Sequence, residues 1–493
     1  MATASEKKSL LASYVTGITD SAGERYVTIL GYFWPELITA LLVSSVLNLI
    51  DASMIGHLKS TSMYATLGVA LTIVLFLNKM AEGLSVGTVI LCGQYNGMRR
   101  FTDVGRAAMS AFWVTVLVGG LIAAALYFGA ASLFAFLHVP HKMAHFGIAF
   151  MRLRVVSIFL FFVYMALVGF LRGTKNTRVP MIFFVVGAVV FVFFDYTLIF
   201  GHFGFPALGL MGSAIASIIQ NAVMLVAALG YIFCDTQMRQ YSIQAIRSFD
   251  AQAALDIFRL SSPVILDKAL LAGAKIWLVR LIAPMGKVAL ASYSVIRDME
   301  QFAFVPAIAF ASVITLLVSN DYGSGNWPGI KSNVKKVLFL ASGLVFTILL
   351  LFALFPEAVI GFFSVKSRVV FFAATAFPVV SVLVLFDLLQ VVLAGALRGA
   401  ANVRLVMVTR LLVCGLVFLP LSYWFSTLPI SNILVKFILI YGCFYLSDGV
   451  MSMVYVWWFR RDSWRSTAVS YKGAVDATYN RERDTTPRQP SAH

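Results

Sequence analysis

Long apolar stretches alternate with short polar segments along most of the chain. A helix needs about 20 predominantly apolar residues to cross a bilayer, whereas the strands of a membrane barrel alternate apolar and polar residues. The apolar stretches are unbroken, so we predict an all-α polytopic membrane protein. Its twelve expected spans lie near 28–56, 62–92, 104–131, 146–170, 180–201, 208–234, 257–283, 289–318, 334–359, 370–396, 404–426 and 431–459.

The composition supports a membrane protein. Of the 493 residues, 60% are hydrophobic and 12% are charged, and the mean hydropathy is +0.88. Soluble domains carry about 25% charged residues, so a surface that faces water throughout is excluded. The four cysteines lie in or beside apolar stretches without paired spacing, which indicates packing and neither a disulfide nor a metal site.

The net charge of +16 is concentrated in short loops and in the tail. Basic residues such as Arg99, Arg172, Lys331 and Arg398 fall in the loops that follow even-numbered spans. By contrast, "GHFGFPALG" after the fifth span and "STLPISN" after the eleventh contain no lysine or arginine. The positive-inside rule then predicts that both termini are cytoplasmic. We expect the membrane to be a plasma membrane, of the bacterial inner-membrane type. Charge distributed in this way indicates contact with a lipid bilayer and no nucleic-acid partner.

An internal repeat divides the chain into two halves. LVGFLRGTKNTRVPM at Leu167–Met181 matches LAGALRGAANVRLVM at Leu393–Met407 at eight of fifteen positions, and "CGQYNG" after the second span weakly resembles "SNDYGSG" after the eighth. Six spans separate the matched segments, so both halves have the same orientation in the membrane and form a parallel repeat. The predicted regions are a cytoplasmic leader (1–27), an amino-terminal lobe (28–234), a cytoplasmic linker (235–256), a carboxy-terminal lobe (257–459) and a cytoplasmic disordered tail (460–493).

Several strings resemble the multidrug and toxic compound extrusion (MATE) transporters. They are "NLIDASMIGHL", "LSVGTVILCGQYNG", "GFLRGTKNTRVPM", "DYTLIFGHFGFPALGLMGSAIAS" and, most specifically, "FDLLQVVLAGALRGAANVR". The resemblance covers nearly all of the spans. It implies twelve helices in two lobes, and efflux of organic, often cationic, compounds driven by inward flow of protons or sodium.

Acidic residues inside the spans are the main candidates for ion coupling. Asp51, Asp195 and Asp387 each lie in apolar surroundings, where a charge is costly and usually faces an interior cavity. A carboxylate that exchanges a proton for another cation is a simple basis for antiport. The resemblance assigns Asp51 and Asp195 to an amino-lobe protonation site and Asp387 to a carboxyl-lobe cation site, with Ser217 as a nearby hydroxyl. The alternative is that these carboxylates pair with internal bases and only hold helices together.

Two departures from the family pattern leave the coupling ion open between H⁺ and Na⁺. The sodium-coupled branch places a glutamate in the seventh span where Leu271 stands here, and Asp267, one turn earlier, is a candidate substitute. The proton-coupled branch often has an asparagine where Phe191 stands.

Other polar residues inside the spans are candidates for lining a substrate cavity. Lys79 with Glu82, and Arg297 with Glu300, have the i,i+3 spacing of ion pairs along one helix. Lys268 and Lys275 share a helix face, and in a cleft they would favour an anionic or zwitterionic ligand; alternatively they reach an interface or pair with Asp267. The full set is Asn78, Lys79, Glu82, Ser217, Lys268, Lys275, Arg297, Glu300, Gln301 and Gln390.

These features predict a transporter and no enzyme. The chain has no GxxxxGK[ST] phosphate loop, no H-E-x-x-H metal motif and no G-x-S-x-G serine motif. The leading hypothesis is a monomeric antiporter that exports small amphipathic organic compounds by alternating access, with no cofactor besides the coupling ion. The alternatives are a flippase of a lipid-linked precursor, an exporter of an anionic metabolite, and a scaffold that transports nothing.

Overall fold

The computed structural model describes residues 22–56, 61–136, 141–243, 249–363 and 367–466, and the regular elements in these ranges are helices. The first half contains α2 (Tyr26–Leu41), the π-helical turn η1 (Leu42–Val46), α3 (Leu47–Gly56), α4 (Thr61–Gly97), α5 (Phe101–Phe136), α6 (His141–Gly173), α7 (Arg178–Phe200), α8 (Leu210–Cys234) and the short 3₁₀ helix η2 (Thr236–Tyr241). The second half contains α9 (Ala251–Ile282), η3 (Ala283–Met285), α10 (Lys287–Gly323), α11 (Trp327–Leu354), α12 (Pro356–Phe363), α13 (Ser367–Gly399), α14 (Val403–Val413), the π-helical turn η4 (Cys414–Phe418), α15 (Leu419–Thr427), α16 (Ile433–Arg460) and η5 (Ser463–Ser466).

The all-α prediction is confirmed, and each of the twelve expected spans coincides with helix. Ten helices among the described residues are long and apolar enough to cross a membrane. The other two expected spans are also helical: 28–56 is formed by α2, η1 and α3, and 257–283 falls in α9, whose charged residues reduce its apolarity. The predicted leader up to residue 21 and the tail after residue 466 lie outside the described residues.

The seventh span begins earlier than its apolar pattern suggests. Helix α9 starts at Ala251, inside the linker predicted over 235–256, and η2 occupies another part of that linker. The side chain of Asp250 caps α9 by accepting hydrogen bonds from the backbone N–H groups of Gln252 (2.9 Å) and Ala253 (3.3 Å). A polar cap of this kind starts a helix independently of hydropathy.

The sequence repeat corresponds to a repeated packing contact. A Cβ on Gly169 of α6 would lie 2.8 Å from the carbonyl oxygen of Ser85 on α4, and one on Gly395 of α13 would lie 2.7 Å from that of Ala311 on α10. Both glycines and both partners are 226 positions apart. Glycine at these positions therefore lets the backbones of α6 and α4, and of α13 and α10, approach each other in the same way.

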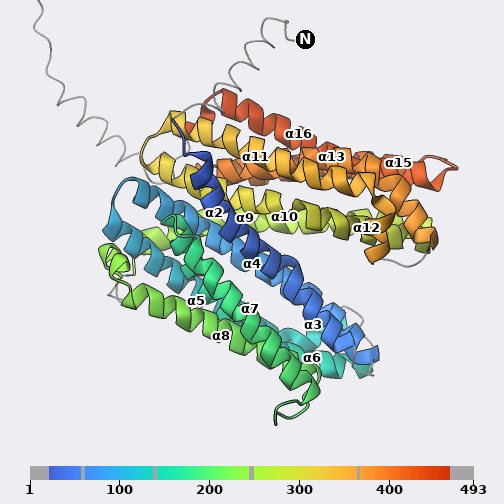
Figure 1. The fold of residues 1–493 in the computed structure, drawn as a ribbon, viewed down its shortest axis with the longest axis horizontal. Coiled ribbons are helices and arrows are strands. Elements are labelled where there is room, and N and C mark those ends of the chain that lie inside the picture. The colour runs from blue at the N-terminus through green and yellow to red at the C-terminus, as the bar shows by residue number, and fades with distance from the viewer. Residues whose placement is uncertain (1–21, 57–60, 137–140, 244–248, 364–366, 467–493) are drawn as a thin grey trace, which may run out of the picture.

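Two groups of helices can be followed in Figure 1, one from α3 to α8 and the other from α10 to α16. The two groups come together at the end of the molecule where α2 begins. They diverge toward the opposite end, where α3 and the start of α6 lie apart from α12 and α15. Helix α4 contacts α9 and α10, and α2 contacts α10, so these helices form the interface between the halves.

Candidate functional site

The two halves touch most closely where α4 and α10 end. A Cβ on Gly97 would lie 2.0 Å from the carbonyl oxygen of Asn320, and a Cβ on Gly323 would lie 2.0 Å from that of Gln94. Gly97 and Gly323 are 226 positions apart, and so are Gln94 and Asn320. The weak similarity between "CGQYNG" and "SNDYGSG" therefore corresponds to a reciprocal contact between the halves.

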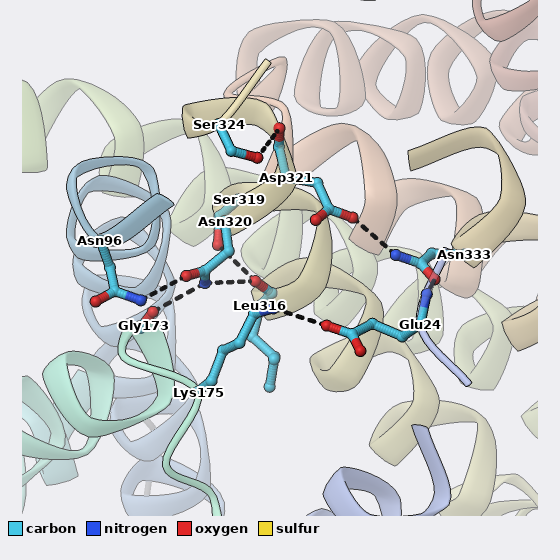
Figure 2. A network of polar contacts seen from close by, with 10 residues as sticks. All are labelled: Glu24, Asn96, Gly173, Lys175, Leu316, Ser319, Asn320, Asp321, Ser324 and Asn333. Atoms are coloured by element: carbon cyan, nitrogen blue, oxygen red, sulfur yellow. Dashed lines mark hydrogen bonds and ion pairs between the residues drawn. The ribbon is translucent and has the colours of Figure 1, made fainter. Parts of the chain in front are cut away.

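Hydrogen bonds surround this contact (Figure 2). The Asn96 side chain donates to the Asn320 Oδ1 at 2.7 Å, and Asn320 Nδ2 donates to the Gly173 carbonyl oxygen at 2.9 Å. Asn320 of the second half thus bonds to α4 and to the end of α6 in the first. These bonds hold the halves together at the end of the molecule where α2 begins.

Glu24, just before α2, bridges the halves at the same end (Figure 2). Its carboxylate pairs with Lys175, after α6, at 2.9 Å, and its backbone N–H donates to Asn333 Oδ1 of α11 at 2.8 Å. Lys336 of α11 donates to the Glu24 carbonyl oxygen at 3.0 Å. Burial alone would lower the pKa of Lys175, but the hydrogen bond and the charge of Glu24 outweigh it, and the pKa is raised.

A second ion pair between the halves joins α4 and α9. Glu82 lies between Lys79 of its own helix, at 2.8 Å, and Lys268 of α9, at 3.1 Å. The predicted pairing of Lys79 with Glu82 is therefore present. Lys268 reaches across to Glu82 and does not pair with Asp267.

A small cavity of about 70 Å³ lies inside the first half. Polar residues from several helices line it, among them Asp51 of α3, Asn78 of α4, Arg154 of α6, and Ser217 and Asn221 of α8. Apolar side chains, including that of Phe191 on α7, complete the wall. A drug-sized ligand needs a pocket of about 300–1,000 Å³, so this cavity suits ions and a few water molecules.

Asp51, which lines this cavity, and Asp195, on which the charge of Asp51 acts, are both buried, with relative exposures of 2% and 0%. Ser213 of α8 donates a hydrogen bond of 2.7 Å to Asp51 Oδ1. Neither carboxylate oxygen of Asp195 has a hydrogen-bond partner among the residues that the structure describes.

Sequence reasoning did not identify Arg154, a buried residue of α6 that lines the same cavity. Its guanidinium donates to the Ser217 hydroxyl and, at 3.4 Å, to the Ser213 carbonyl oxygen. Its positive charge acts on both Asp51 and Asp195. The sequence does carry a signal, since Arg154 lies inside the apolar fourth span, where a charge needs a partner.

Asp387 lies on α13 in the second half, near Lys275 of α9 and Glu300 of α10. The charge of Lys275 acts on both acids, and the Lys275 side chain is exposed. Glu300 is buried and accepts hydrogen bonds from the hydroxyls of Tyr441 and Tyr445 on α16. These tyrosines are a further pair that sequence reasoning did not single out.

The expected pairing of Arg297 with Glu300 is not formed. Arg297 instead pairs with its neighbour Asp298 at 2.8 Å, because the tyrosines of α16 already bond to Glu300. Gln301 is exposed and Gln390 is buried.

Asp267 is buried between two arginines. Arg398 of α13 lies 2.6 Å and Arg410 of α14 lies 2.5 Å from its carboxylate oxygens. The repeat places Arg172 at the position equivalent to Arg398, and Arg172 pairs with Glu36 of α2 at 2.8 Å. In each half, the arginine of the LRG motif therefore pairs with an acid on the first helix of that half.

Known proteins match the chain over both halves. The family model described as MatE matches residues 37–197 and again 263–424, and the two matches start 226 residues apart. The probable multidrug resistance protein NorM of Rhizobium meliloti is 28% identical over 77% of this chain and 82% of its own length. The multidrug resistance protein NorM of Photobacterium profundum is 23% identical over 81% of this chain and 85% of its own length.

Solved structures share the fold. The Vibrio cholerae MATE transporter VcmN in its bent form superposes with a TM-score of 0.81 at 18% identity, covering 91% of this chain and 99% of that one. A MOP superfamily transporter from Pyrococcus furiosus, described as having a binding pocket of reverse polarity, gives a TM-score of 0.79 at 17% identity over 90% of this chain and 96% of that one.

Proposed function

The chain belongs to the MATE family of multidrug transporters, and from this premise we propose that it is an antiporter exporting small amphipathic organic compounds in exchange for protons or sodium. The observation that carries the proposal is a pair of buried carboxylates whose charges interact, Asp51, which lines a cavity of ionic size, and Asp195. Buried charges are costly, and a site that binds and releases a cation uses that cost to respond to an ion gradient. Asp387 is proposed as a second exchange site in the carboxy-terminal lobe.

Alternating access requires that the cleft open to one side at a time. The glycine contact of α4 with α10 and the bridge through Glu24 close the end where α2 begins. The basic loops lie at that end, which we propose is cytoplasmic, so the described arrangement is outward-facing. Opening toward the cytoplasm then requires breaking these contacts.

Asp267 has a different role in this proposal. Its two arginine partners compensate its charge completely, so it fixes α9 against α13 and α14 and does not exchange an ion. Exchange is therefore assigned to Asp51 and Asp195, which act together as one amino-lobe site, and to Asp387.

The test is uptake of a fluorescent lipophilic cation into proteoliposomes of purified protein under an imposed proton or sodium gradient. The gradient should drive uptake, and the Asp51→Asn and Asp387→Asn double variant should lose it. Glu357→Gln, a change at an exposed acid of α12, is the matched control and should behave as the wild type. Unchanged coupling in the double variant would refute the assignment of these residues.

A second candidate function is export of an anionic metabolite. Lys275 is exposed and has no carboxylate within 4.0 Å among the described residues, although it lies near the carboxyl-lobe acids. Competition between anionic and cationic amphiphiles for uptake, in wild type and Lys275→Gln, separates the two candidates. Preferential transport of the anion that is lost in Lys275→Gln would establish the second.

A further inference from the structure

Three buried charged groups from three helices lie close enough in the amino-terminal lobe for their charges to interact: Asp51 of α3, Arg154 of α6 and Asp195 of α7. Among the described residues that line the cavity or face Asp195, these three are the charged groups, and the polar neighbours are neutral. The neutral neighbours are Asn78 of α4, Ser157 of α6, and Ser213, Ser217, Gln220 and Asn221 of α8. The charge of the cluster is therefore set by two acids and one base.

Arg154 is fixed in position by α8. Its Nη1 donates to the Ser217 hydroxyl and to the Ser213 carbonyl oxygen at 3.4 Å, and the Ser213 hydroxyl in turn donates to Asp51 at 2.7 Å. A guanidinium stays charged at any physiological pH. Arg154 and Asp51 thus form a connected, oppositely charged unit across α6, α8 and α3.

Asp195 is the acid of the cluster that does not belong to this connected unit. Its carboxylate is fully buried, and neither oxygen has a hydrogen-bond partner among the described residues. A second negative charge here would face Asp51 and lack hydrogen bonds, whereas the protonated form avoids both costs. With Asp195 protonated, the charges of Arg154 and Asp51 cancel.

We propose that Arg154 is a built-in counter-charge that reserves the amino-lobe site for one proton, carried by Asp195, and excludes sodium. This inference rests on the proposed cation-coupled antiport and names the ion that it uses. Sodium needs several oxygen ligands and is held by a surplus of negative charge. A fixed guanidinium beside the two acids cancels one of their charges and repels a second cation in the same small cavity. A proton needs neither, because it binds covalently to one carboxylate oxygen of Asp195 and leaves again toward the other side.

Sodium response and proton response are measured separately to test this. The melting temperature of the purified protein is recorded with and without sodium, and uptake into proteoliposomes is driven by a pH step or by a sodium step. The variants are Arg154→Gln, which removes the counter-charge, Arg154→Lys, which keeps it, and Arg152→Gln. Arg152 is the matched control, because it lies on the same helix but is exposed and stacks on Tyr127.

Wild type, Arg154→Lys and Arg152→Gln should respond to the pH step and show no sodium effect. Arg154→Gln should acquire a rise in melting temperature with sodium and sodium-stimulated uptake, because its two acids then lack a fixed positive partner. The inference is overturned if sodium alone drives the wild type, or if Arg154→Gln responds to both ions as Arg152→Gln does.

If Arg154→Gln does not fold, Asp195→Asn tests the proposal in its place. It retains the Arg154 and Asp51 unit, so it should keep the wild-type melting temperature and lose the response to the pH step. A retained response overturns the proposal. If the wild type moves no organic compound under either gradient, the proposed antiport fails, while the sodium-dependent melting of the variants still tests the counter-charge.

Discussion

Replacing Gly97 by alanine should loosen the end of the molecule at which the two lobes meet. The new Cβ would lie 2.0 Å from the Asn320 carbonyl oxygen, whereas ordinary van der Waals contact begins at 3.4 Å. The ends of α4 and α10 must therefore separate by about 1.4 Å. The hydrogen bond between Asn96 and Asn320, now 2.7 Å long, would lengthen to about 4.1 Å and break.

The size of the effect follows from the cost of overpacking. Inserting a methyl group into a tight contact costs about 1–3 kcal/mol, which shifts an equilibrium between two conformations by about 5- to 150-fold. The strain exists only while the lobes touch at this end, so the shift favours the state in which this end is open. Gly323→Ala should act in the same way, because it occupies the equivalent position.

Distances between spin labels measure this shift. Labels at Arg106→Cys on α5 and Arg404→Cys on α14 place one exposed probe on each lobe near the closed end. Gly97→Ala should increase the population in which the two labels are farther apart, relative to the labelled protein that keeps Gly97. Gly68→Ala, on the same helix but with open space around the new Cβ, should leave the distribution unchanged. An unchanged distribution in both Gly97→Ala and Gly323→Ala would refute the closed-end interpretation.

Two further predictions concern ion pairs that differ in burial and place. Asp267→Asn should lower the stability of the protein by about 3–5 kcal/mol, because it breaks the pairs with Arg398 and the buried Arg410 and leaves Arg410 only the more distant Asp448, at 4.0 Å. Asp298→Asn, which breaks a half-exposed pair, should cost about 1 kcal/mol or less. Thermal unfolding in detergent measures both, and equal losses would contradict the structural role of Asp267. The pair of Lys175 with Glu24 raises the pKa of Lys175, so its stabilisation is fully present below the ordinary lysine pKa of 10.5 and is lost as the pH rises through the raised value. Lys175→Met should remove this alkaline loss from the pH profile of the melting temperature, and an unchanged profile would show that the bridge contributes nothing.

The helices and the repeat could be predicted from the sequence because both depend on local or periodic signals. Apolar length marks the spans, and the repeated LRG motif marks a glycine contact that is the same in both halves. Even the weak sequence similarity between the segments around Gly97 and Gly323 corresponds to a contact between the halves. The apolar pattern does not locate the start of α9, because the cap at Asp250 lies outside the apolar stretch.

The partners of the charged residues could not be predicted with the same success. Spacing along one helix identified the pair of Lys79 with Glu82, but it failed for Glu300, whose hydrogen bonds come from α16, more than 140 residues away. Asp267 likewise finds its arginines on α13 and α14. Such partners depend on how distant helices are rotated against one another, and hydropathy carries no information on that rotation.

The central claim is that the amino-terminal lobe couples transport to protons through Asp195 beside the fixed charge of Arg154. The most direct measurement is uptake of a lipophilic cation by wild-type proteoliposomes under a pH step alone and under a sodium step alone. The account predicts uptake with the pH step and none with the sodium step. Uptake driven by sodium at equal pH on both sides would contradict it.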